Sequence, residues 1–317
     1  MISLSMRHLK YFDALARLGH FGRAAESCAI SQPALSMQIK ELEELVGAPL
    51  VERGARQMRL TGLGEDFAAR VRDILSAVDD LADLARASQQ RLTGRLRIGV
   101  IPTVAPYLLP GIITALGEAH PGLDLRPREA VTGRLIEDLL AGRLDTAIVA
   151  LPISEPSLEE VALFDEDFVL VRAPEDAGKP VPDPAELRQM RLLLLEEGHC
   201  FRDQALSFCK LSPSVARDLM EGSSLSTLVQ MVGAGIGVTL VPEIALPIET
   251  RSAQVSVAQL PEPRPRRTIG MVWRRSNPLG PQLSRISATL STAGIAAHAK
   301  ARFAPASTAP RDDLAGR

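Results

Sequence analysis

The chain has 317 residues, of which 46% are hydrophobic and 23% are charged, and its formal net charge is −2 at pH 7. This is the composition of an ordinary globular protein, and the length indicates about two domains. The near-neutral charge argues against broad coating of nucleic acid, although a local basic patch can still bind it. Three cysteines in the whole chain are too few for a structural disulfide framework.

The N-terminus predicts neither export nor membrane insertion. It lacks the basic region, apolar region and small-residue cleavage site of a signal peptide. Pro102, Pro106 and Pro110 interrupt the best apolar run, which falls short of the roughly 18 residues of a membrane span. We therefore expect a soluble, cytoplasmic protein without membrane contact. In that reducing compartment disulfides are transient, catalytic or sensing.

Three helices are predicted in the first fifty residues. Apolar residues recur at helical spacing over residues 6–18, a short helix follows over residues 22–28, and a third helix ends at Gly47. Ser31 is the expected N-cap of the third helix, with Pro33 in its first turn. One face of this helix is apolar and the other shows small, uncharged or basic residues, which suits the recognition helix of a helix-turn-helix in the DNA major groove. The expected DNA contacts are Ser31, Gln32, Pro33, Ser36, Met37 and Lys40.

The segment after the third helix predicts a β-hairpin with its turn at Gly54. Beside a helix-turn-helix such a hairpin is a wing, and Arg53, Arg56 and Arg59 are expected to reach phosphates or the minor groove. The alternative, a small domain of another kind with solvated arginines, is disfavoured by the combination of parts. Residues 1–63 are therefore expected to form a winged helix-turn-helix domain. We expect Cys28, at the end of the second helix, to be a small buried residue.

Residues 64–92 predict one long linker helix. Its apolar residues repeat in alternating steps of four and three, which is the a/d seam of a coiled coil. We expect two copies to pair through this seam and to present two recognition helices to one DNA molecule. The alternative is a helix that lies against its own domain. The seam residues are Phe67, Val71, Ile74, Val78, Leu81 and Ala85.

After Gly94 strands and helices alternate, as in a parallel α/β sheet. Residues 93–300 are expected to form a regulatory domain of two Rossmann-like α/β subdomains, like a periplasmic binding protein, joined by crossing strands around a hinged cleft. Ligands of such sheets bind at the carboxyl ends of strands, where Thr103, Thr132 and the turn at residues 198–200 should lie. The expected strands are residues 95–102, 123–130, 144–151, 164–174, 191–198, 237–242 and 266–273, and the expected helices are residues 104–119, 133–141 and 224–234.

The end of the chain predicts no packed structure. From about residue 296 it is rich in alanine and small polar residues and holds two prolines. We expect residues 301–317 to be a disordered tail.

Several runs resemble a known family. SQPALSMQIKELEELVGAPLVER resembles the DNA-binding segment of LysR-type transcriptional regulators. Members of that family that respond to hydrogen peroxide are similar to this chain over roughly residues 1–295, and the most specific run is GHCFRDQALSFC. The other similar runs are IPTVAPYLLP, LFDEDFVL, SLSTLVQMVGAGIGVTLVP and PRRTIGMVW.

The resemblance implies a transcriptional activator of oxidative-stress genes, with hydrogen peroxide as its signal. It implies that Cys200, the peroxidatic residue, becomes a sulfenic acid that Cys209, the resolving residue, captures as a reversible disulfide. It further implies a homotetramer, a dimer of dimers, that binds double-stranded promoter DNA and RNA polymerase. A glutaredoxin- or thioredoxin-type protein is the expected reductant. No cofactor, no metal and no enzymatic activity are expected.

The residues around Cys200 suit this chemistry. A thiol attacks peroxide only as thiolate, and Cys200 follows Gly198 at the start of a helix, whose N-terminal N–H groups favour negative charge. Two potential cations, His199 and Arg202, lie near Cys200 in the sequence. The hydroxyl of Thr103 could hydrogen-bond the peroxide or the departing hydroxide. The expected peroxide pocket consists of Thr103, Thr132, His199, Arg202 and Asp203.

The spacing of Cys200 and Cys209 has a geometric consequence. Nine residues of α-helix rise about 13.5 Å and turn by about 180°, whereas a disulfide needs Cα atoms about 4.4–6.8 Å apart. The bond therefore requires the segment to unwind, and such a two-state element can change a dimer interface. Two alternatives stay open. One is a LysR-type regulator that binds a small metabolite, with both thiols as core residues, and the other is a thiol peroxidase, against which the helix-turn-helix counts.

Overall fold

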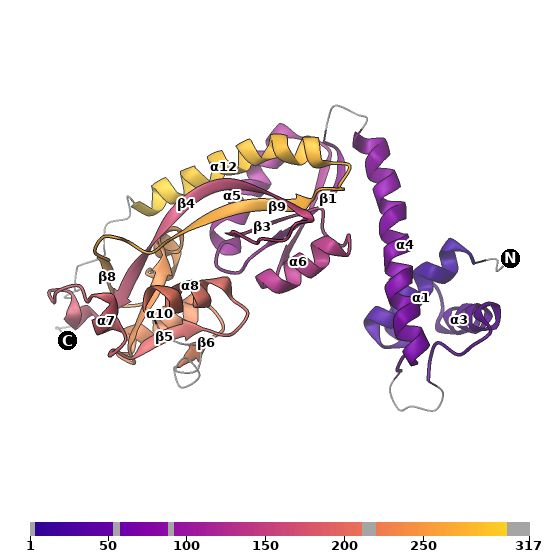
Figure 1. Ribbon diagram of the computed structural model, residues 1–317, viewed down its shortest axis with the longest axis horizontal. Coiled ribbons are helices and arrows are strands. Elements are labelled where there is room, and N and C mark those ends of the chain that lie inside the picture. Colours follow the sequence, from indigo (N-terminus) through magenta and orange to yellow (C-terminus); the bar gives the residue numbers. More distant parts are fainter. Residues whose placement is uncertain (1–3, 53–57, 88–91, 211–219, 303–317) are drawn as a thin grey trace, which may run out of the picture. The chain divides into compact units, whose positions relative to one another are not determined.

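A computed structural model describes residues 4–52, 58–87, 92–210 and 220–302 (Figure 1). The chain divides into two compact units, Met1–Ala85 and Arg86–Arg317. Arg53, Arg56 and the part of the expected tail from residue 303 onward lie outside the described residues. Within the described ranges, every helix is too short or too polar to cross a membrane.

The first unit contains the three predicted helices, α1 (Met6–Leu18), α2 (Phe21–Ser27) and α3 (Gln32–Val46). The Ser31 hydroxyl accepts the N–H of Ala34 and so caps α3 as predicted. Gly47 ends α3 in the left-handed region, with φ 79°, where a residue without a Cβ is unstrained. Cys28 is the C-cap of α2 and packs against the core of this unit, but it is only half-buried where a buried residue was predicted, because that helix end lies near the surface.

The hairpin arms after α3 pair as expected. Val51 and Leu60 form an antiparallel bridge, and the N–H of Glu52 donates to the carbonyl of Arg59 at 2.9 Å. The Thr61 hydroxyl then accepts the N–H of Gly64 at 3.0 Å, at the start of α4 (Gly62–Ala87). The hairpin therefore leads directly into the long helix, which begins two residues before its predicted start.

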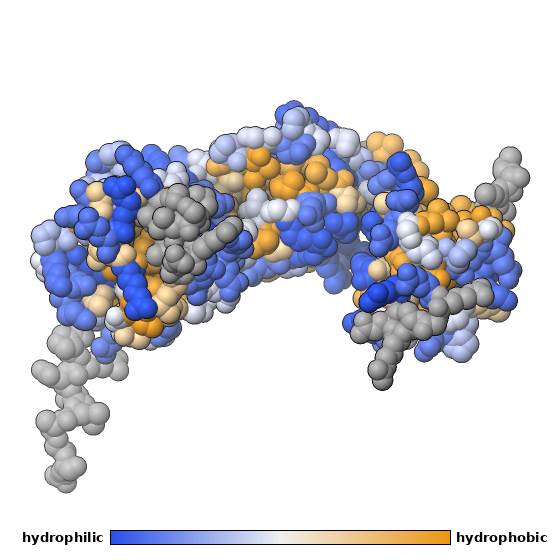
Figure 2. Space-filling model, turned by 60° about the horizontal axis from the view of Figure 1, so that its bottom comes forward, coloured by the Kyte–Doolittle hydropathy of each residue, from blue (hydrophilic) through white to orange (hydrophobic). Residues whose placement is uncertain are grey.

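The predicted seam of α4 has two different parts. Phe67 packs edge-to-face on Phe12 with ring centroids 5.5 Å apart, and Val71 is fully buried, so this end of the helix belongs to the core of its own unit. Ile74, Val78 and Leu81 are 46%, 39% and 66% exposed. Apolar side chains reach the surface in patches on both units (Figure 2). The exposed half of the seam is free to contact a second copy, so pairing through it stays a prediction.

The second unit is built on one nine-stranded sheet, with β8 paired beside β4 and the other strands in the order β2-β1-β3-β9-β4-β7-β5-β6. The sheet is mixed, not parallel as predicted: β1 is parallel to β2 and β3, and β5 to β6 and β7, but β4 and β9 run antiparallel to their neighbours. The strands are β1 (Gly94–Val100), β2 (Leu123–Glu129), β3 (Thr146–Leu151), β4 (Leu158–Arg172), β5 (Leu192–Leu195), β6 (Glu221–Gly222), β7 (Val238–Pro242), β8 (Ser256–Gln259) and β9 (Arg266–Arg274).

Strands β4 and β9 are the predicted crossing strands. Residues 158–167 of β4 pair with β9, whereas residues 168–172 pair with β7 and β8. One strand therefore runs from the first subdomain into the second. Each subdomain has its own core, the first around Ile98, Leu108 and Trp273 and the second around Phe168 and Leu240.

Helices cover both faces of this sheet (Figure 1). One of them, α12, was not predicted and lies along β4, β9 and α5; its Leu283, Ile286 and Leu290 are buried in the first core. It continues to Arg302, so the expectation of unpacked chain from about residue 296 was wrong. The helices are α5 (Ala105–Ala119), α6 (Thr132–Leu140), η1 (Pro174–Asp176), α7 (Pro184–Leu187), α8 (Cys200–Phe208), α10 (Leu225–Gly233), η2 (Glu243–Ala245), α11 (Leu246–Glu249) and α12 (Gly280–Arg302).

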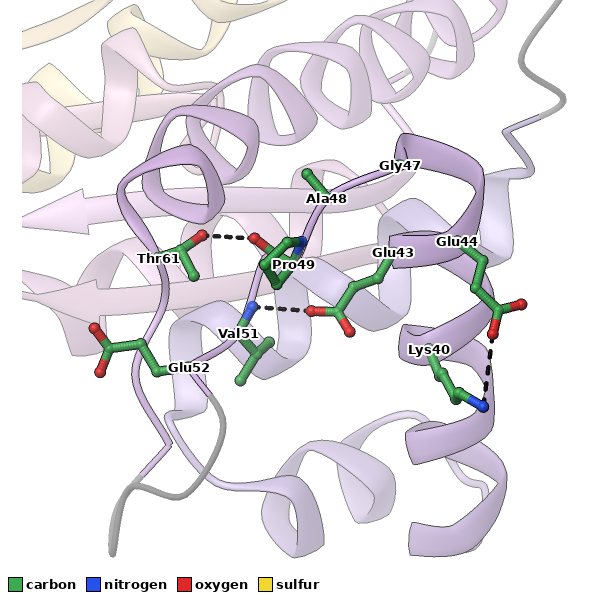
Figure 3. Close-up of a pocket in the computed structure, with 9 residues that line it drawn as sticks. All are labelled: Lys40, Glu43, Glu44, Gly47, Ala48, Pro49, Val51, Glu52 and Thr61. Atoms are coloured by element: carbon green, nitrogen blue, oxygen red, sulfur yellow. Dashed lines mark hydrogen bonds and ion pairs between the residues drawn. The ribbon is translucent and has the colours of Figure 1, made fainter.

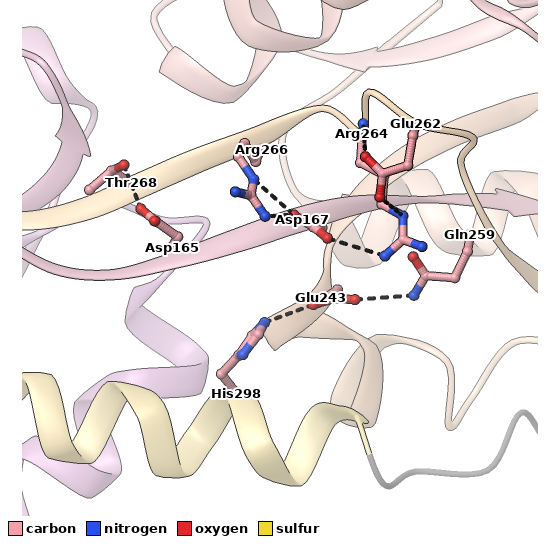
Figure 4. Close-up of polar contacts among 9 residues, drawn as sticks. All are labelled: Asp165, Asp167, Glu243, Gln259, Glu262, Arg264, Arg266, Thr268 and His298. Atoms are coloured by element: carbon pink, nitrogen blue, oxygen red, sulfur yellow. Dashed lines mark hydrogen bonds and ion pairs between the residues drawn. The ribbon is translucent and has the colours of Figure 1, made fainter.

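Polar contacts fix the crossing strands and the end of α12 (Figure 4). Asp167 on β4 pairs with Arg266 on β9 at 3.0 Å. His298 near the end of α12 meets Glu243 on η2 at 2.7 Å, and Glu243 also accepts from Gln259 on β8 at 3.1 Å. A helix that packs on the first core is thus tied to the second subdomain at its far end.

Candidate functional site

A narrow pocket lies where three loops meet at the carboxyl ends of strands β1, β2 and β5. The space measures about 160 Å³ and has no room for a water molecule. Three of the five predicted pocket residues, Thr103, Thr132 and His199, lie around it together with Cys200. Because it is so narrow, a bound peroxide requires a small movement of its walls. The full lining is Ile101, Pro102, Thr103, Val131, Thr132, His199 and Cys200.

Cys200 is the first residue of α8, after a turn in which Gly198 has φ 95°. The first N–H groups of a helix have no intrahelical acceptor and favour negative charge beside them. His199 is the N-cap but makes no side-chain cap. Cys200 is half-buried and packs against the core of the first subdomain, although α8 otherwise belongs to the second. The thiol therefore lies between the two subdomains.

Two threonine hydroxyls differ in what they already bind. The Thr132 Oγ1 is buried and makes no hydrogen bond among the described residues. The Thr103 Oγ1 accepts from the guanidinium of Arg267 at 2.8 Å, and the Thr103 carbonyl accepts from the same group at 3.1 Å. Thr132 thus has a hydroxyl at the pocket without a partner among the described residues, whereas that of Thr103 already accepts from Arg267 and still has its own hydrogen to donate.

Arg267 is a buried cation that the sequence interpretation missed. Its guanidinium pairs with Glu166 at 2.7 Å, both side chains being fully buried, and lies 5.5 Å from the ring centre of Phe201 on α8. It joins the crossing strands to the loop of Thr103 and to the residue after Cys200. The available signal was its position in β9, where it alternates in the buried phase with Ile269.

His199 is in an environment that disfavours its charged form. Burial lowers the pKa of its imidazole, and the nearby charges of Glu196 and Glu129 only partly oppose this. At neutral pH the ring is therefore neutral. His199 can exchange a hydrogen bond with a reactant, but it does not supply the cation that the sequence interpretation placed beside Cys200.

Arg202 and Asp203 do not line the pocket. Asp203 is exposed on α8. The guanidinium of Arg202 donates to the carbonyl of Leu195 at 2.7 Å and pairs with Glu221 at 2.6 Å. Helix geometry explains both placements, because residues two and three positions after Cys200 point to other faces of α8.

Cys209 lies at the other end of α8, where it is the C-cap. It is fully buried in the second core. Burial raises the pKa of its thiol to about 11, against a smaller opposing effect of Arg188. At neutral pH this thiol is protonated. The two cysteines are separate and reduced, at opposite ends of one helix and in contact with different cores.

All six predicted DNA contacts on α3 lie on its exposed face, and Met37 is 64% exposed. Arg59, in the second hairpin arm, is exposed as well. A pocket between the end of α3 and this hairpin is lined by polar groups that join the two (Figure 3). There the carboxylate of Glu43 accepts the N–H groups of Leu50 at 2.7 Å and Val51 at 3.0 Å. These bonds fix the hairpin beside the end of α3.

Comparison with known proteins defines the class. The family of bacterial regulatory helix-turn-helix proteins of the lysR type matches residues 6–65, and the LysR substrate binding domain matches residues 89–294. The chain belongs to the LysR family of DNA-binding transcriptional regulators. No group of three His, Cys, Asp or Glu side chains suited to a metal occurs in the described part of the chain.

Relatives narrow the class further. The probable hydrogen peroxide-inducible genes activator of Streptomyces viridosporus is 41% identical over 293 residues, which cover 91% of this chain and 94% of the relative. The DNA-binding transcriptional dual regulator OxyR of Escherichia coli K12 is 41% identical over 278 residues, covering 87% and 91%. Within the LysR family, this chain belongs to the hydrogen peroxide-inducible genes activators, or OxyR proteins.

Solved structures agree with this placement. A full-length OxyR of Pseudomonas aeruginosa, in which a cysteine is replaced by aspartate, matches with a TM-score of 0.71 and 35% identity, covering 91% of this chain and 95% of that one. The hydrogen peroxide-bound form of Corynebacterium glutamicum OxyR, in which a cysteine is replaced by serine, matches with a TM-score of 0.67 and 33% identity, covering 98% of both chains.

Proposed function

We propose that this protein senses hydrogen peroxide through Cys200 and Cys209 and converts their oxidation into a change of promoter binding. The observation that carries the proposal is the placement of two reduced thiols at opposite ends of α8, one at a narrow pocket that two threonines line and one in a closed apolar core. The pocket disfavours the metabolite alternative, since it has no room even for a water molecule, whereas ordinary small-molecule sites measure roughly 300–1,000 Å³.

The first step is attack of the Cys200 thiolate on one oxygen of the peroxide. The S–O bond forms as the O–O bond breaks, and the departing hydroxide takes a proton and leaves as water, so that Cys200 becomes a sulfenic acid. The Thr132 hydroxyl, with no partner in the described structure, is placed to hydrogen-bond the peroxide. Thr103 contributes its remaining hydrogen, and the N-terminus of α8 stabilises the thiolate.

The second step is attack of the Cys209 sulfur on the sulfenic sulfur of Cys200. The S–S bond forms, the S–O bond breaks, and hydroxide leaves with a proton as water. Across both steps the two thiols lose two electrons and two hydrogens to the peroxide. Because α8 holds the sulfurs apart and keeps Cys209 protonated, its unwinding must precede this step. Unwinding replaces a packed helix by another conformation, which is a two-state change able to act on an oligomer interface.

The DNA-binding unit is the part of the protein through which oxidation is proposed to change promoter binding. Gln32, Ser36 and the other exposed residues of α3 read bases, while Arg53, Arg56 and Arg59 of the wing contact the DNA backbone or minor groove. The exposed half of the α4 seam pairs two copies, and two such dimers form the tetramer. RNA polymerase and a glutaredoxin- or thioredoxin-type reductant are the proposed protein partners. A promoter-binding role places the protein in the cytoplasm with the chromosome.

The direct test treats the reduced full-length protein with one equivalent of hydrogen peroxide and locates the oxidation by mass spectrometry. We expect a loss of two hydrogens in the peptides that contain Cys200 and Cys209, together with a changed footprint on promoter DNA. Cys200→Ser should fold, bind DNA and show neither change. A wild-type protein that keeps both thiols after this treatment would contradict the proposal and favour the metabolite alternative.

The DNA contacts have a separate test. Arg59→Ala should weaken binding to specific and random DNA alike and reduce the salt slope by about one, the loss of one phosphate contact. Gln32→Ala should instead change which sequence is preferred, since the side chain is exposed on α3. Equal losses on specific and random DNA for Gln32→Ala would contradict the assignment of α3 as the recognition helix.

A further inference from the structure

Arg202 joins the first turn of α8 to two strands of the second subdomain. Its side chain is only 4% exposed, and its NH1 lies 2.7 Å from the carbonyl oxygen of Leu195 at the end of β5 and 2.6 Å from the carboxylate of Glu221 on β6. Glu221 is 33% exposed. A buried guanidinium that meets both a carbonyl and a carboxylate makes charge-assisted hydrogen bonds, the strong kind in proteins.

The position of Glu221 couples this contact to the cysteines. β6 consists of two residues, and Glu221 pairs with Leu194 of β5 in parallel register. Cys209 and Glu221 belong to one continuous stretch of chain that leaves the C-terminal end of α8, while Arg202 lies in its first turn. The Arg202–Glu221 pair therefore ties the first turn of α8, which begins at Cys200, to the ends of β5 and β6.

This tie holds α8 in the conformation that keeps the two sulfurs apart. The two sulfurs can meet only if α8 unwinds, and unwinding of its first turn would carry the backbone of Arg202 away from the strand ends where Leu195 and Glu221 hold its guanidinium. A conformation in which this turn has unwound cannot keep the pair, so the pair favours the reduced conformation. An interaction made in only one of two states biases the equilibrium between them by its full strength.

We propose that the Arg202–Glu221 pair is a latch on the reduced conformation, and that Glu221 is a positioning residue that sets how readily the Cys200–Cys209 disulfide forms. This proposal rests on the proposed function. It assigns Arg202 to the equilibrium between the two conformations rather than to the attack on peroxide, because its guanidinium is held by Leu195 and Glu221 and does not line the pocket. The oxidant is hydrogen peroxide, and the bonds made and broken are those of the two steps above.

Glu221→Gln is the main variant, since it removes the charge from a partly exposed side chain and keeps its shape. In the full-length protein, equilibrated with mixtures of reduced and oxidised glutathione, we expect the thiol–disulfide equilibrium to move about tenfold toward the disulfide, given the strength of a partly buried charged hydrogen bond. For a two-electron couple this is a potential about 30 mV more negative. Glu221→Lys should move it further in the same direction, because it places a second cation beside Arg202.

Glu175→Gln is the matched control, an exposed glutamate on η1 that forms no ion pair among the described residues. It should leave the potential unchanged. In a Cys209→Ser background, Glu221→Gln should also leave the rate of sulfenic acid formation unchanged. Arg202→Ala is a less clean variant, since it removes a buried side chain and can unfold the subdomain.

The outcomes separate the two proposals. An unchanged potential for Glu221→Gln, in a protein that does form the Cys200–Cys209 bond, would overturn the latch and leave the proposed function standing. Slower sulfenic acid formation for Glu221→Gln in the Cys209→Ser background would overturn the latch as well, because it would mean that the Arg202–Glu221 pair acts on the attack on peroxide. If the wild type forms no such bond, the proposed function itself fails. A more negative potential with an unchanged first step supports the latch.

Discussion

The two ends of α8 are only nine residues apart in sequence, but they place the same chemical group in opposite surroundings. At the N-terminal end, Cys200 is half-buried beside the hydroxyls of Thr103 and Thr132 and the first N–H groups of the helix. At the C-terminal end, Cys209 is fully enclosed by the second core, and burial raises the pKa of its thiol to about 11. In the proposed function the first end reacts with peroxide, and the second stays protected until α8 changes.

This difference teaches that the order of events is a property of the fold. A protonated, enclosed thiol is a poor nucleophile, so Cys209 cannot react before α8 changes. Cys200 contacts the first core and Cys209 the second, so bringing the sulfurs together must remove at least one of them from its place. Oxidation of Cys200 would therefore have to change the conformation around Cys209 before the disulfide can form.

The strongest test of the comparison removes the protected thiol. Cys209→Ser should still react once with peroxide at Cys200, but with no resolving sulfur the disulfide should be lost completely. The sulfenic acid should persist and then gain a second oxygen in excess peroxide, to sulfinic acid. Mass spectrometry after timed additions measures this. If Cys209→Ser consumed peroxide no faster than Cys200→Ser, the two ends would not differ as described.

Much of this contrast was visible in the sequence, because it depends on local patterns. The helices of the first unit, the position of Cys200 after a glycine turn and the assembly of Thr103, Thr132 and His199 at strand ends all follow from periodicity and topology. The direction of the Arg202 side chain does not, since it depends on β6, a two-residue strand far along the chain. Arg267 and Glu166 are brought into contact only by the pairing of β4 with β9.

The helix α12 was missed for a related reason. Its sequence is dominated by alanine, serine and threonine, so its amphipathic pattern is weak. Leu283, Ile286 and Leu290 stabilise it by packing into the first core, and His298 meets Glu243 of the second subdomain. Packing of this kind supplies most of the stability of a helix in a protein and cannot be read from propensity alone.

The second test concerns the raised pKa of Cys209. Below about pH 9 the Cys209 thiol is protonated in both the folded and the unfolded chain, so its ionisation takes nothing from the free energy of unfolding. As the pH rises toward about 11, only the unfolded chain loses this proton, and the free energy of unfolding falls. The loss should reach up to about 2–3 kcal/mol, from two pH units at about 1.4 kcal/mol each. Urea unfolding at pH 8 and pH 10.5 measures it.

Cys209→Ala is the control for this measurement. The substitution should cost stability at pH 8 through the lost packing, by about 1–2 kcal/mol, but it cannot show the alkaline loss that belongs to the thiol. The gap between wild type and variant should therefore narrow as pH rises. A gap that stays constant from pH 8 to pH 10.5 would mean that Cys209 is not held protonated by the fold.

The third test concerns the reactive end. Thr132→Val keeps the shape of the side chain and removes a hydroxyl that has no partner among the described residues. Stability should therefore change little, while the rate of sulfenic acid formation should fall about tenfold, the value of one hydrogen bond to the reactant. Stopped-flow measurement in a Cys209→Ser background gives this rate. Thr103→Val is the contrasting variant, since it also breaks the bond to Arg267 and should lose stability as well.

The smallest effect on stability and on the peroxide response is expected for substitution of the third cysteine, Cys28, which lies at neither end of α8. Cys28 is half-buried at the C-cap of α2, in the DNA-binding unit, and its sulfur lies 3.8 Å from the hydroxyl of Ser27. Cys28→Ser should cost under about 1 kcal/mol, because a partly exposed hydroxyl can be solvated. Peroxide should still produce the Cys200–Cys209 bond and activate transcription in a promoter assay. Loss of that response, with folding and DNA binding unchanged, would show that the redox chemistry is not confined to the two ends of α8.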